Sequence, residues 1–215
     1  MVVKGKDMHE MLNLKILVIE PHFDDAIYSM GGTICKLSNT NTDVTVLTVF
    51  NVYQKANTDR YLEQLSAFRG YICHLKQLNY KDAVSRSNDL ILEKNMFKEI
   101  KHKIQQLILD KSIDIMFFPM ACGNHVDHII VHQICKSLDV KHKYQYEDLP
   151  YAYKYSAKSK EGYVICKIDI EEKIKRCLLY KTQINIETIK KIREHAYLIG
   201  KAIKNCDYAE KFWIS

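Results

Sequence analysis

Short apolar runs alternate with longer segments of helical spacing along most of this chain, and this alternation limits the folds that it can adopt. Strand-like runs lie at residues 14–20, 44–50, 76–78, 114–119, 163–168 and 211–215. Helical spacing marks residues 26–37, 60–76, 90–109, 126–138, 171–180 and 187–202. The run at 44–50 is almost continuously apolar, as is typical of a strand that is covered on both faces. The order predicts an α/β fold with a Rossmann-like, three-layer architecture, in which helices flank a mainly parallel sheet.

Length and composition indicate one domain over residues 1–215. A chain of 215 residues can bury most of its apolar surface in a single core. It has 47% hydrophobic and 27% charged residues, which is ordinary for a globular protein. The formal net charge of +6 comes from scattered lysines. A nucleic-acid-binding surface needs a concentrated basic stripe, so we expect no nucleic-acid partner.

Cysteine usage and hydropathy favour a cytoplasmic protein. The seven cysteines form no C-x-x-C pair, and an odd number suits reduced, buried thiols better than a disulfide framework. The first dozen residues lack the apolar core of a signal peptide, and no run approaches 18 apolar residues. We therefore expect no integral membrane contact.

Two clusters of histidine and aspartate follow two of the expected strands. Pro21-His22-Phe23-Asp24-Asp25 comes directly after the first strand, and Asn124-His125-Val126-Asp127-His128 follows the run that ends at Pro119. Because the carboxyl ends of parallel strands share one edge of the sheet, the two loops can converge on one metal ion. The leading interpretation is a metal-dependent hydrolase.

The first cluster offers two ligands and a base. A catalytic zinc ion takes three protein ligands from His and Asp or Glu and keeps one position for water. His22 and Asp25, three residues apart at a helix start, can turn toward one point. Asp24 then lies beside the metal and can take a proton from the bound water.

The second cluster can complete the site. One of His125 and His128 can supply the third ligand, and the other can donate a proton or a hydrogen bond to the oxyanion of an attacked carbonyl. Asp127 can orient that second imidazole. Two histidines, one aspartate and an open position suit Zn²⁺, Fe²⁺ or Co²⁺.

Simpler interpretations of the same residues stay open. His22 can be a hydrogen-bonded loop residue, and Asp24 or Asp25 can cap the following helix. Cys122 with His125 can form a cysteine hydrolase. A non-catalytic sugar- or nucleotide-binding module is a further alternative, although the first strand turn lacks a G-x-G-x-x-G run.

At these clusters the chain resembles the PIG-L/LmbE-like family of zinc-dependent N-deacetylases. The run from His22 to Asp25, followed by Gly31-Gly32-Thr33, is similar to the family's His-Pro-Asp-Asp and Gly-Gly motifs. His125-Val126-Asp127-His128 matches its His-x-Asp-His motif. Weaker similarities are Asp43 to Thr48, Arg60 with Glu63, Tyr180 to Gln183, Asp82-Ala83 with Arg86, Tyr146 to Tyr151, and Glu210 to Phe212.

Two departures from the family pattern bear on the site. Phe23 stands where the family usually has proline, and Tyr28-Ser29-Met30 fills a stretch often written with Leu and Gly. The metal-binding residue types are intact, so we expect metal binding to survive. The floor of the pocket is expected to differ.

The resemblance implies a role for each site residue. His22, Asp25 and His128 would bind zinc, and Asp24 would act as the general base. His125, with Asp127 as its partner, would stabilise the oxyanion or protonate the leaving amine. Arg60 and Asp82 would contact substrate.

The implied reaction is zinc-dependent hydrolysis of an N-acyl group, foremost N-acetyl, from an amino sugar or sugar conjugate. The alternative within the family is a zinc amidase for another acyl amide or a thiol conjugate. The expected partner is this small-molecule substrate, and assembly into a homo-oligomer stays open.

Overall fold

The computed structural model describes residues 14–40, 42–52, 58–86, 90–153, 162–203 and 206–215. Within these residues, seven strands form one sheet of order β3-β2-β1-β4-β5-β7-β6. The strands are β1 (Lys15–Glu20), β2 (Asp43–Val52), β3 (Cys73–Lys81), β4 (Ile115–Pro119), β5 (His142–Tyr146), β6 (Tyr163–Lys167) and β7 (Ala209–Ile214). The helices are α1 (Asp25–Ser38), α2 (Thr58–Ala67), α3 (Leu90–Lys111), α4 (Val126–Lys136), α5 (Ile170–Cys177) and α6 (Ile186–Lys201), with a short 3₁₀ helix at Ala83–Ser85.

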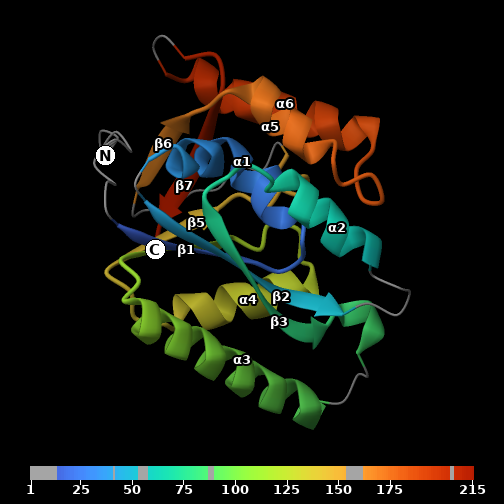
Figure 1. The fold of residues 1–215 in the computed structure, drawn as a ribbon, viewed down its shortest axis with the longest axis vertical. Helices are drawn as coiled ribbons and strands as arrows, with labels where there is room; N and C mark the ends of the chain where they lie inside the picture. Colours follow the sequence, from blue (N-terminus) through green and yellow to red (C-terminus); the bar gives the residue numbers. More distant parts are fainter. Residues whose placement is uncertain (1–13, 41, 53–57, 87–89, 154–161, 204–205) are drawn as a thin grey trace.

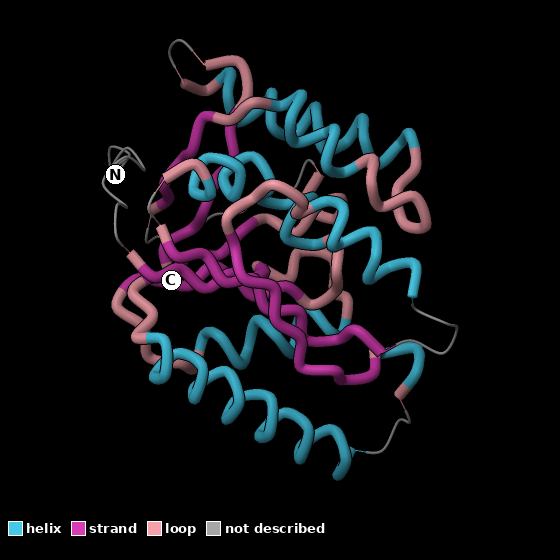
Figure 2. Tube along the Cα trace, viewed as in Figure 1, coloured by secondary structure: helices cyan, strands magenta, loops and turns pink. Residues whose placement is uncertain are grey.

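The expected fold class is confirmed. The five strands from β3 to β5 pair in parallel, and β7 pairs antiparallel with both β5 and β6. The sheet crosses the middle of the molecule, with α3 and α4 on one side and α1, α2, α5 and α6 on the other (Figures 1 and 2). Each side has its own apolar core. The result is an α/β fold of three layers with a mainly parallel sheet.

The helix expected at residues 60–76 is wrong in its second half. Helix α2 ends at Ala67, and β3 begins at Cys73, so the short strand expected at 76–78 is also longer than predicted. Between them Gly70 adopts a φ of +86°, a conformation that glycine reaches without strain and that commonly follows the end of a helix. Beyond Gly70, Ile72 is exposed and precedes β3, and Leu75 belongs to this strand, whose burial pattern alternates. Gly70 was therefore the stop signal in the sequence.

Strand β5 was missed by the sequence analysis. It consists of His142 to Tyr146, with lysine and histidine at its exposed start. Its polar composition hides the alternation, and only its last two residues are buried. It nevertheless pairs with β4 on one edge and β7 on the other. Tertiary pairing, rather than local sequence preference, therefore makes this segment a strand.

Helix α1 contains a kink that a buried ion pair stabilises. Met30 has non-helical dihedral angles (φ −138°, ψ 22°). The carboxylate of Glu210 in β7 accepts hydrogen bonds from the backbone N–H groups of Gly32 (3.1 Å) and Thr33 (2.8 Å), just past the kink. Lys173 of α5 lies 2.7 Å from the same carboxylate and is fully buried. Glu210 thus binds two backbone donors beside the kink, and side-chain contacts of this kind commonly accompany helix kinks.

Helix α5 packs closely against the kinked helix at a glycine. A Cβ atom at Gly32 would lie 2.6 Å from the Cβ of Ile168, which precedes α5. No larger residue fits there without moving one of the two segments. The Gly-Gly pair of the sequence motif therefore serves packing between α1 and α5.

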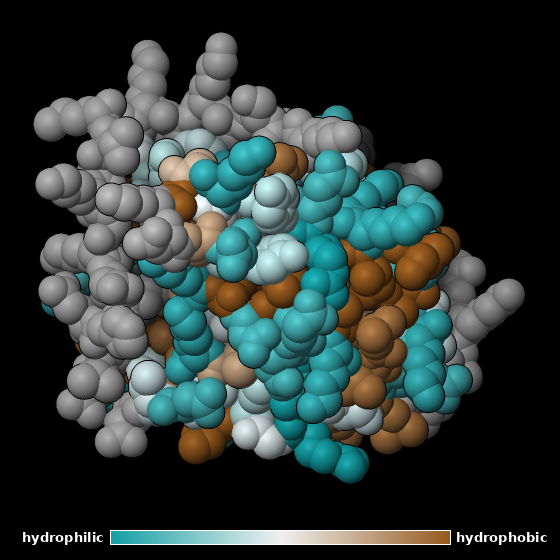
Figure 3. Space-filling model, turned by 90° about the horizontal axis from the view of Figure 1, so that it is seen from above, coloured by the Kyte–Doolittle hydropathy of each residue, from teal (hydrophilic) through white to brown (hydrophobic). Residues whose placement is uncertain are grey.

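The surface of the described residues is of mixed polarity. In Figure 3 polar side chains cover much of the visible face, and apolar side chains gather toward one side of it. Individually exposed apolar side chains are ordinary on globular proteins. Across the described ranges, no helix is long and apolar enough to cross a membrane.

We predict that Glu210→Ala lowers the free energy of unfolding by about 3–5 kcal/mol, because it leaves the buried Lys173 ammonium without its anion. Urea denaturation followed by circular dichroism measures this change. Glu187→Ala is the matched control, since Glu187 pairs with Lys190 on the exposed surface of α6, and it should have little effect. A loss of less than about 1 kcal/mol for Glu210→Ala would show that Lys173 does not depend on this carboxylate.

Candidate active site

The two histidine- and aspartate-rich loops meet because their strands are neighbours. Strands β1 and β4 pair in parallel, so the loop after Glu20 and the loop after Pro119 emerge at the same edge of the sheet. A pocket of about 250 Å³ opens there. Its lining combines residues from both loops with residues from α1, α2, α6 and the segments after β3, β5 and α5. These residues are His22, Asp24, Asp25, Tyr28, Arg60, Asp82, His125, Leu149, Pro150, Tyr151, Gln183 and Thr188. Asp127 and His128 are buried.

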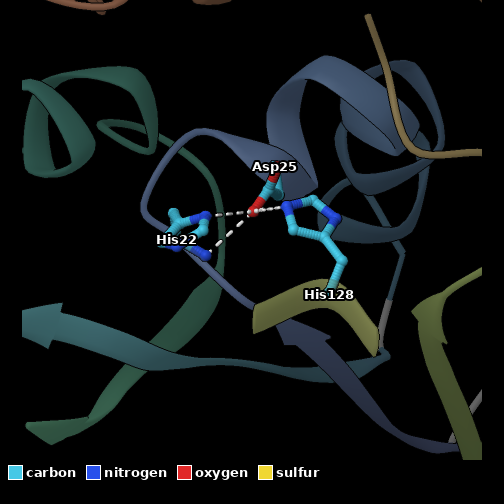
Figure 4. Close-up of side chains that lie close together, drawn as sticks. All are labelled: His22, Asp25 and His128. Atoms are coloured by element: carbon cyan, nitrogen blue, oxygen red, sulfur yellow. Dashed lines mark hydrogen bonds and ion pairs between the residues drawn. The ribbon is translucent and has the colours of Figure 1, made fainter. Parts of the chain in front are cut away.

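One carboxylate oxygen connects the three residues expected to bind metal. Asp25 Oδ2 lies 3.3 Å from His22 Nδ1 and 3.4 Å from His128 Nε2, and it accepts a hydrogen bond from the His22 backbone N–H at 2.8 Å. Figure 4 shows the two imidazoles turned toward this oxygen from opposite sides. One potential ligand atom of each residue lies within 4.8 Å of the others. Two imidazole nitrogens and one carboxylate oxygen form a donor set that suits a divalent transition metal.

His128 is oriented by a carboxylate that the sequence analysis did not single out. Asp148, in the segment after β5, lies 2.6 Å from His128 Nδ1 and also accepts the Cys122 backbone N–H at 3.2 Å. His128 Nδ1 therefore faces Asp148, and Nε2 is the ring nitrogen that faces Asp25. Metal-binding histidines commonly have such a carboxylate partner.

A buried network fixes the segment that carries Asp148. The neighbouring Glu147 lies within hydrogen-bonding distance of His195 Nε2 (2.7 Å), Trp213 Nε1 (2.9 Å) and Lys211 Nζ (2.7 Å). The adjacent acids Glu147 and Asp148 directly follow β5. Two acids in a row were the available signal for Asp148, but the polar sequence of β5 hid the strand end that they follow.

His22 is oriented from its other ring nitrogen. Asp127 Oδ2 lies 3.0 Å from His22 Nε2, and the same carboxylate is bound by Arg86 Nη1 (2.6 Å) and by the Ala83 backbone N–H (2.9 Å). The segment that follows β3 thereby holds the Asp127 carboxylate in place through Ala83 and Arg86. The carboxylate of Asp127 thus contacts His22, whereas the sequence analysis expected it to orient His125.

Asp127 contacts His125 through its backbone instead. The Asp127 N–H donates to His125 Nδ1 at 3.3 Å, which leaves Nε2 of a neutral His125 as the protonated nitrogen. Burial lowers the pKa of His125, and the nearby His22 and His128 lower it further. His125 is therefore a neutral hydrogen-bond donor in the wall of the pocket.

Electrostatics at the candidate ligands favour a cation. Burial opposes the charged forms of His22 and Asp25, but their partners outweigh it. Hydrogen bonds to Asp127 and Asp25 raise the pKa of His22 to about 10, and the charges of His128 and His22 lower the pKa of Asp25 to about 2. A site that retains a proton so strongly between two carboxylates also attracts a metal ion.

Asp24 differs from its neighbour Asp25. It is the N-cap residue of α1, yet its side chain makes no capping hydrogen bond, so the simple capping interpretation does not apply to it. It lines the pocket instead. Burial and the adjacent charge of Asp25 raise its pKa, and Arg60 and His22 oppose this.

Three of the weaker sequence similarities lie at or beside the pocket: Arg60 with Glu63, Tyr180 to Gln183, and the segment that begins at Asp82. Arg60 in α2 donates a hydrogen bond to Gln183. Glu63, one turn further along α2, accepts hydrogen bonds from the N–H (2.8 Å) and hydroxyl (2.7 Å) of Thr182. Asp82 also lines the pocket, and its Oδ1 caps the short 3₁₀ helix through the Ser85 N–H at 2.9 Å.

Glu20 holds the loop between β1 and α1 in place through hydrogen bonds, a role that was not predicted from the sequence. Its carboxylate accepts hydrogen bonds from the Ala26 N–H (3.0 Å), Thr48 Oγ1 (2.7 Å) and Gln64 Nε2 (2.6 Å). Full burial raises the pKa of Glu20 to about 8. An acidic residue at the end of a buried strand was the available signal.

Two solved structures of deacetylases share this fold. A deacetylase of the teicoplanin biosynthesis pathway matches 93% of this chain with 97% of its own, at 18% identity and a TM-score of 0.79. N,N'-diacetylchitobiose deacetylase from Pyrococcus horikoshii matches 98% of this chain and 87% of its own, at 20% identity and a TM-score of 0.74. These similarities establish the fold.

Sequence comparison establishes the family. The PIG-L family, described as GlcNAc-PI de-N-acetylase, matches residues 17–138, more than half of the chain and both clusters. The chain belongs to this family and is an N-deacetylase. It is also 26% identical to the 2'-N-acetylparomamine deacetylase of Streptomyces fradiae, over 85% of this chain and 78% of that protein. Membership in a family of enzymes argues against a non-catalytic binding module.

We predict that Cys122→Ala retains most of the deacetylase activity, because Cys122 is a poor nucleophile. Burial and the negative charge of Asp148 raise the pKa of its thiol to about 12. At pH 7 only about one thiol in 10⁵ is then ionised. Acetate release by the variant and by the alkylated wild-type protein tests this. Inactivation by alkylation together with indifference to chelators would favour a cysteine hydrolase.

Proposed function

We propose that this protein is a zinc-dependent N-deacetylase that removes the acetyl group from an amino sugar or a sugar conjugate. The observation that carries the proposal is the convergence of His22 Nδ1, Asp25 Oδ2 and His128 Nε2 beside a polar pocket. In this proposal residues 1–215 act as one deacetylase domain in the cytoplasm.

His22, Asp25 and His128 would be the protein ligands of the zinc ion. Their donor types match those of catalytic zinc sites, which keep a fourth position for water. A second group, His22, His125 and Asp127, also brings potential ligand atoms within 4.8 Å of one another. It suits zinc less well, because the Asp127 carboxylate is already bound by Arg86 and the Ala83 N–H. When bound, zinc would act as a Lewis acid and lower the pKa of water in its open position.

Asp24 and His125 would move the protons of the reaction. Asp24, which lines the pocket next to Asp25 without serving as a helix cap, would take the proton of the attacking water. His125 Nε2–H would donate a hydrogen bond to the acetyl oxygen as it becomes negative. The proton would then pass to the nitrogen of the leaving amine, and acetate and the free amine would depart. Asp127 would act as a positioning residue for both histidines.

The polar lining supports an amino sugar as the substrate. Arg60, Asp82, Gln183 and Thr188 offer donors and acceptors around the pocket, and Tyr151 offers an aromatic face. A volume of about 250 Å³ suits one sugar ring. Two relatives are named for the N-acetylated amino sugars paromamine and chitobiose. Arg60 and Asp82 would be the substrate-binding residues.

The proposal predicts metal-dependent acetate release from at least one N-acetylated amino sugar. A panel that includes N-acetylglucosamine, diacetylchitobiose and 2'-N-acetylparomamine would be assayed after chelation and after adding zinc back. Chelation should abolish release and zinc should restore it. Metal bound at one ion per chain with no release from any sugar would redirect the search to other acyl amides and thiol conjugates.

Two variants in the same assay separate the base from a ligand. Asp24→Asn should lower kcat by about 10²- to 10⁴-fold, with the metal content unchanged. His22→Ala should lose both activity and metal. Zinc retained at one ion per chain in His22→Ala would overturn the ligand assignment.

We also predict that Asp148→Asn weakens metal affinity by about 10- to 100-fold, since the amide holds the His128 ring less strongly and reduces its basicity. Competition with a chelator of known affinity measures this change. Asp139→Asn, which alters an exposed carboxylate after α4, is the matched control and should leave the affinity unchanged. Equal affinities of Asp148→Asn and the wild type would remove Asp148 from the metal site.

A further inference from the structure

Tyr28 lies in the first half of α1, lines the pocket, and is only 2% exposed. Its hydroxyl oxygen is buried and has no hydrogen-bond partner among the residues that the structure describes. The adjacent Ser29 is different, because its hydroxyl accepts the Leu149 N–H at 3.1 Å. Tyr28 therefore combines a side chain that lines the pocket with a buried hydroxyl that has no partner among the described residues.

An unpartnered buried hydroxyl destabilises the folded protein unless a partner reaches it. A phenylalanine would provide the same ring packing, including the edge-to-face contact with Tyr180 at 5.6 Å between ring centroids. A ligand that enters the pocket lined by Tyr28 can supply a hydrogen-bond partner and recover the free energy lost through the unpaired hydroxyl.

The charges around Tyr28 define what that partner is. Burial and the negative charge of Asp24 raise the pKa of the phenol well above its usual value, and Asp25 and Glu63 act in the same direction. The phenol therefore stays protonated and is available as a donor. Its partner must carry an acceptor oxygen, and a sugar hydroxyl is such a group.

We propose that Tyr28 is a specificity-determining residue, whose hydroxyl donates a hydrogen bond to a ring hydroxyl of the N-acetylated amino sugar in the pocket. This inference rests on the proposed function of the same pocket. It gives a role to the phenol that stands where the family often has an apolar residue or glycine. An N-acylated amine without a neighbouring hydroxyl would leave Tyr28 unpaired in the complex, and would bind less well for that reason.

Tyr28→Phe tests the proposal by removing one oxygen atom. The KM for the best sugar of the panel should rise by about 3- to 10-fold, the usual effect of losing one neutral hydrogen bond, while kcat stays close to the wild-type value. Metal content should stay at one ion per chain, and the melting temperature should stay the same or increase, since an unpaired hydroxyl is removed.

Tyr180→Phe is the matched control. The Tyr180 hydroxyl is also buried without a partner among the described residues, but Tyr180 does not line the pocket. This variant should keep the wild-type KM. An unchanged KM in Tyr28→Phe would overturn the proposal, and a lower melting temperature with that unchanged KM would assign the hydroxyl a structural partner instead.

Direct binding of N-acetylglucosamine, measured by calorimetry, separates this inference from the proposed reaction. If the wild type binds the sugar, Tyr28→Phe weakens binding, and no acetate is released, the proposed function fails and the role of Tyr28 stands. If the wild type releases acetate and Tyr28→Phe behaves like it, only the role of Tyr28 fails. If the wild type neither binds nor hydrolyses any amino sugar of the panel, both the proposed function and the role of Tyr28 are overturned.

Discussion

The parallel pairing of β1 with β4 is the constraint on which the candidate active site depends. Residues 22–25 and 125–128 are about a hundred positions apart in the chain, and only this pairing brings their loops to one edge of the sheet. The pairing brings His128 of the second loop to Asp25 Oδ2, which also contacts His22 of the first loop. Everything proposed about the chemistry follows from that juxtaposition, since neither loop alone contains a complete set of ligands and a base.

A set of buried carboxylates then fixes the geometry around this oxygen. Asp127 orients His22, Asp148 orients His128, and Glu20 holds the loop between β1 and α1. Each accepts hydrogen bonds from backbone N–H groups or from other side chains, which offsets the cost of burying a charged or polar group. Side chains supported in this way lose little freedom when a ligand binds, which is what a preorganised site requires.

The sequence was sufficient for the fold class and for the meeting of the loops after β1 and β4, because both depend on short patterns. Apolar runs marked β1, β2 and β4, and the loops after β1 and β4 carried the reactive residue types. Strand β5 and the partners of Asp127 could not be predicted in the same way. They depend on pairing and contacts between distant segments, such as Arg86 with Asp127 and β5 with β7. The end of α2 was readable from Gly70 but was obscured by apolar residues that belong to β3.

Anomalous diffraction at the zinc edge, from a crystal grown with zinc, shows directly whether His22, Asp25 and His128 bind one metal ion. We expect one peak per chain, about 2.0–2.2 Å from His22 Nδ1, Asp25 Oδ2 and His128 Nε2. A peak bound instead by His22 Nε2, His125 and Asp127, or no peak between the two loops, would contradict it.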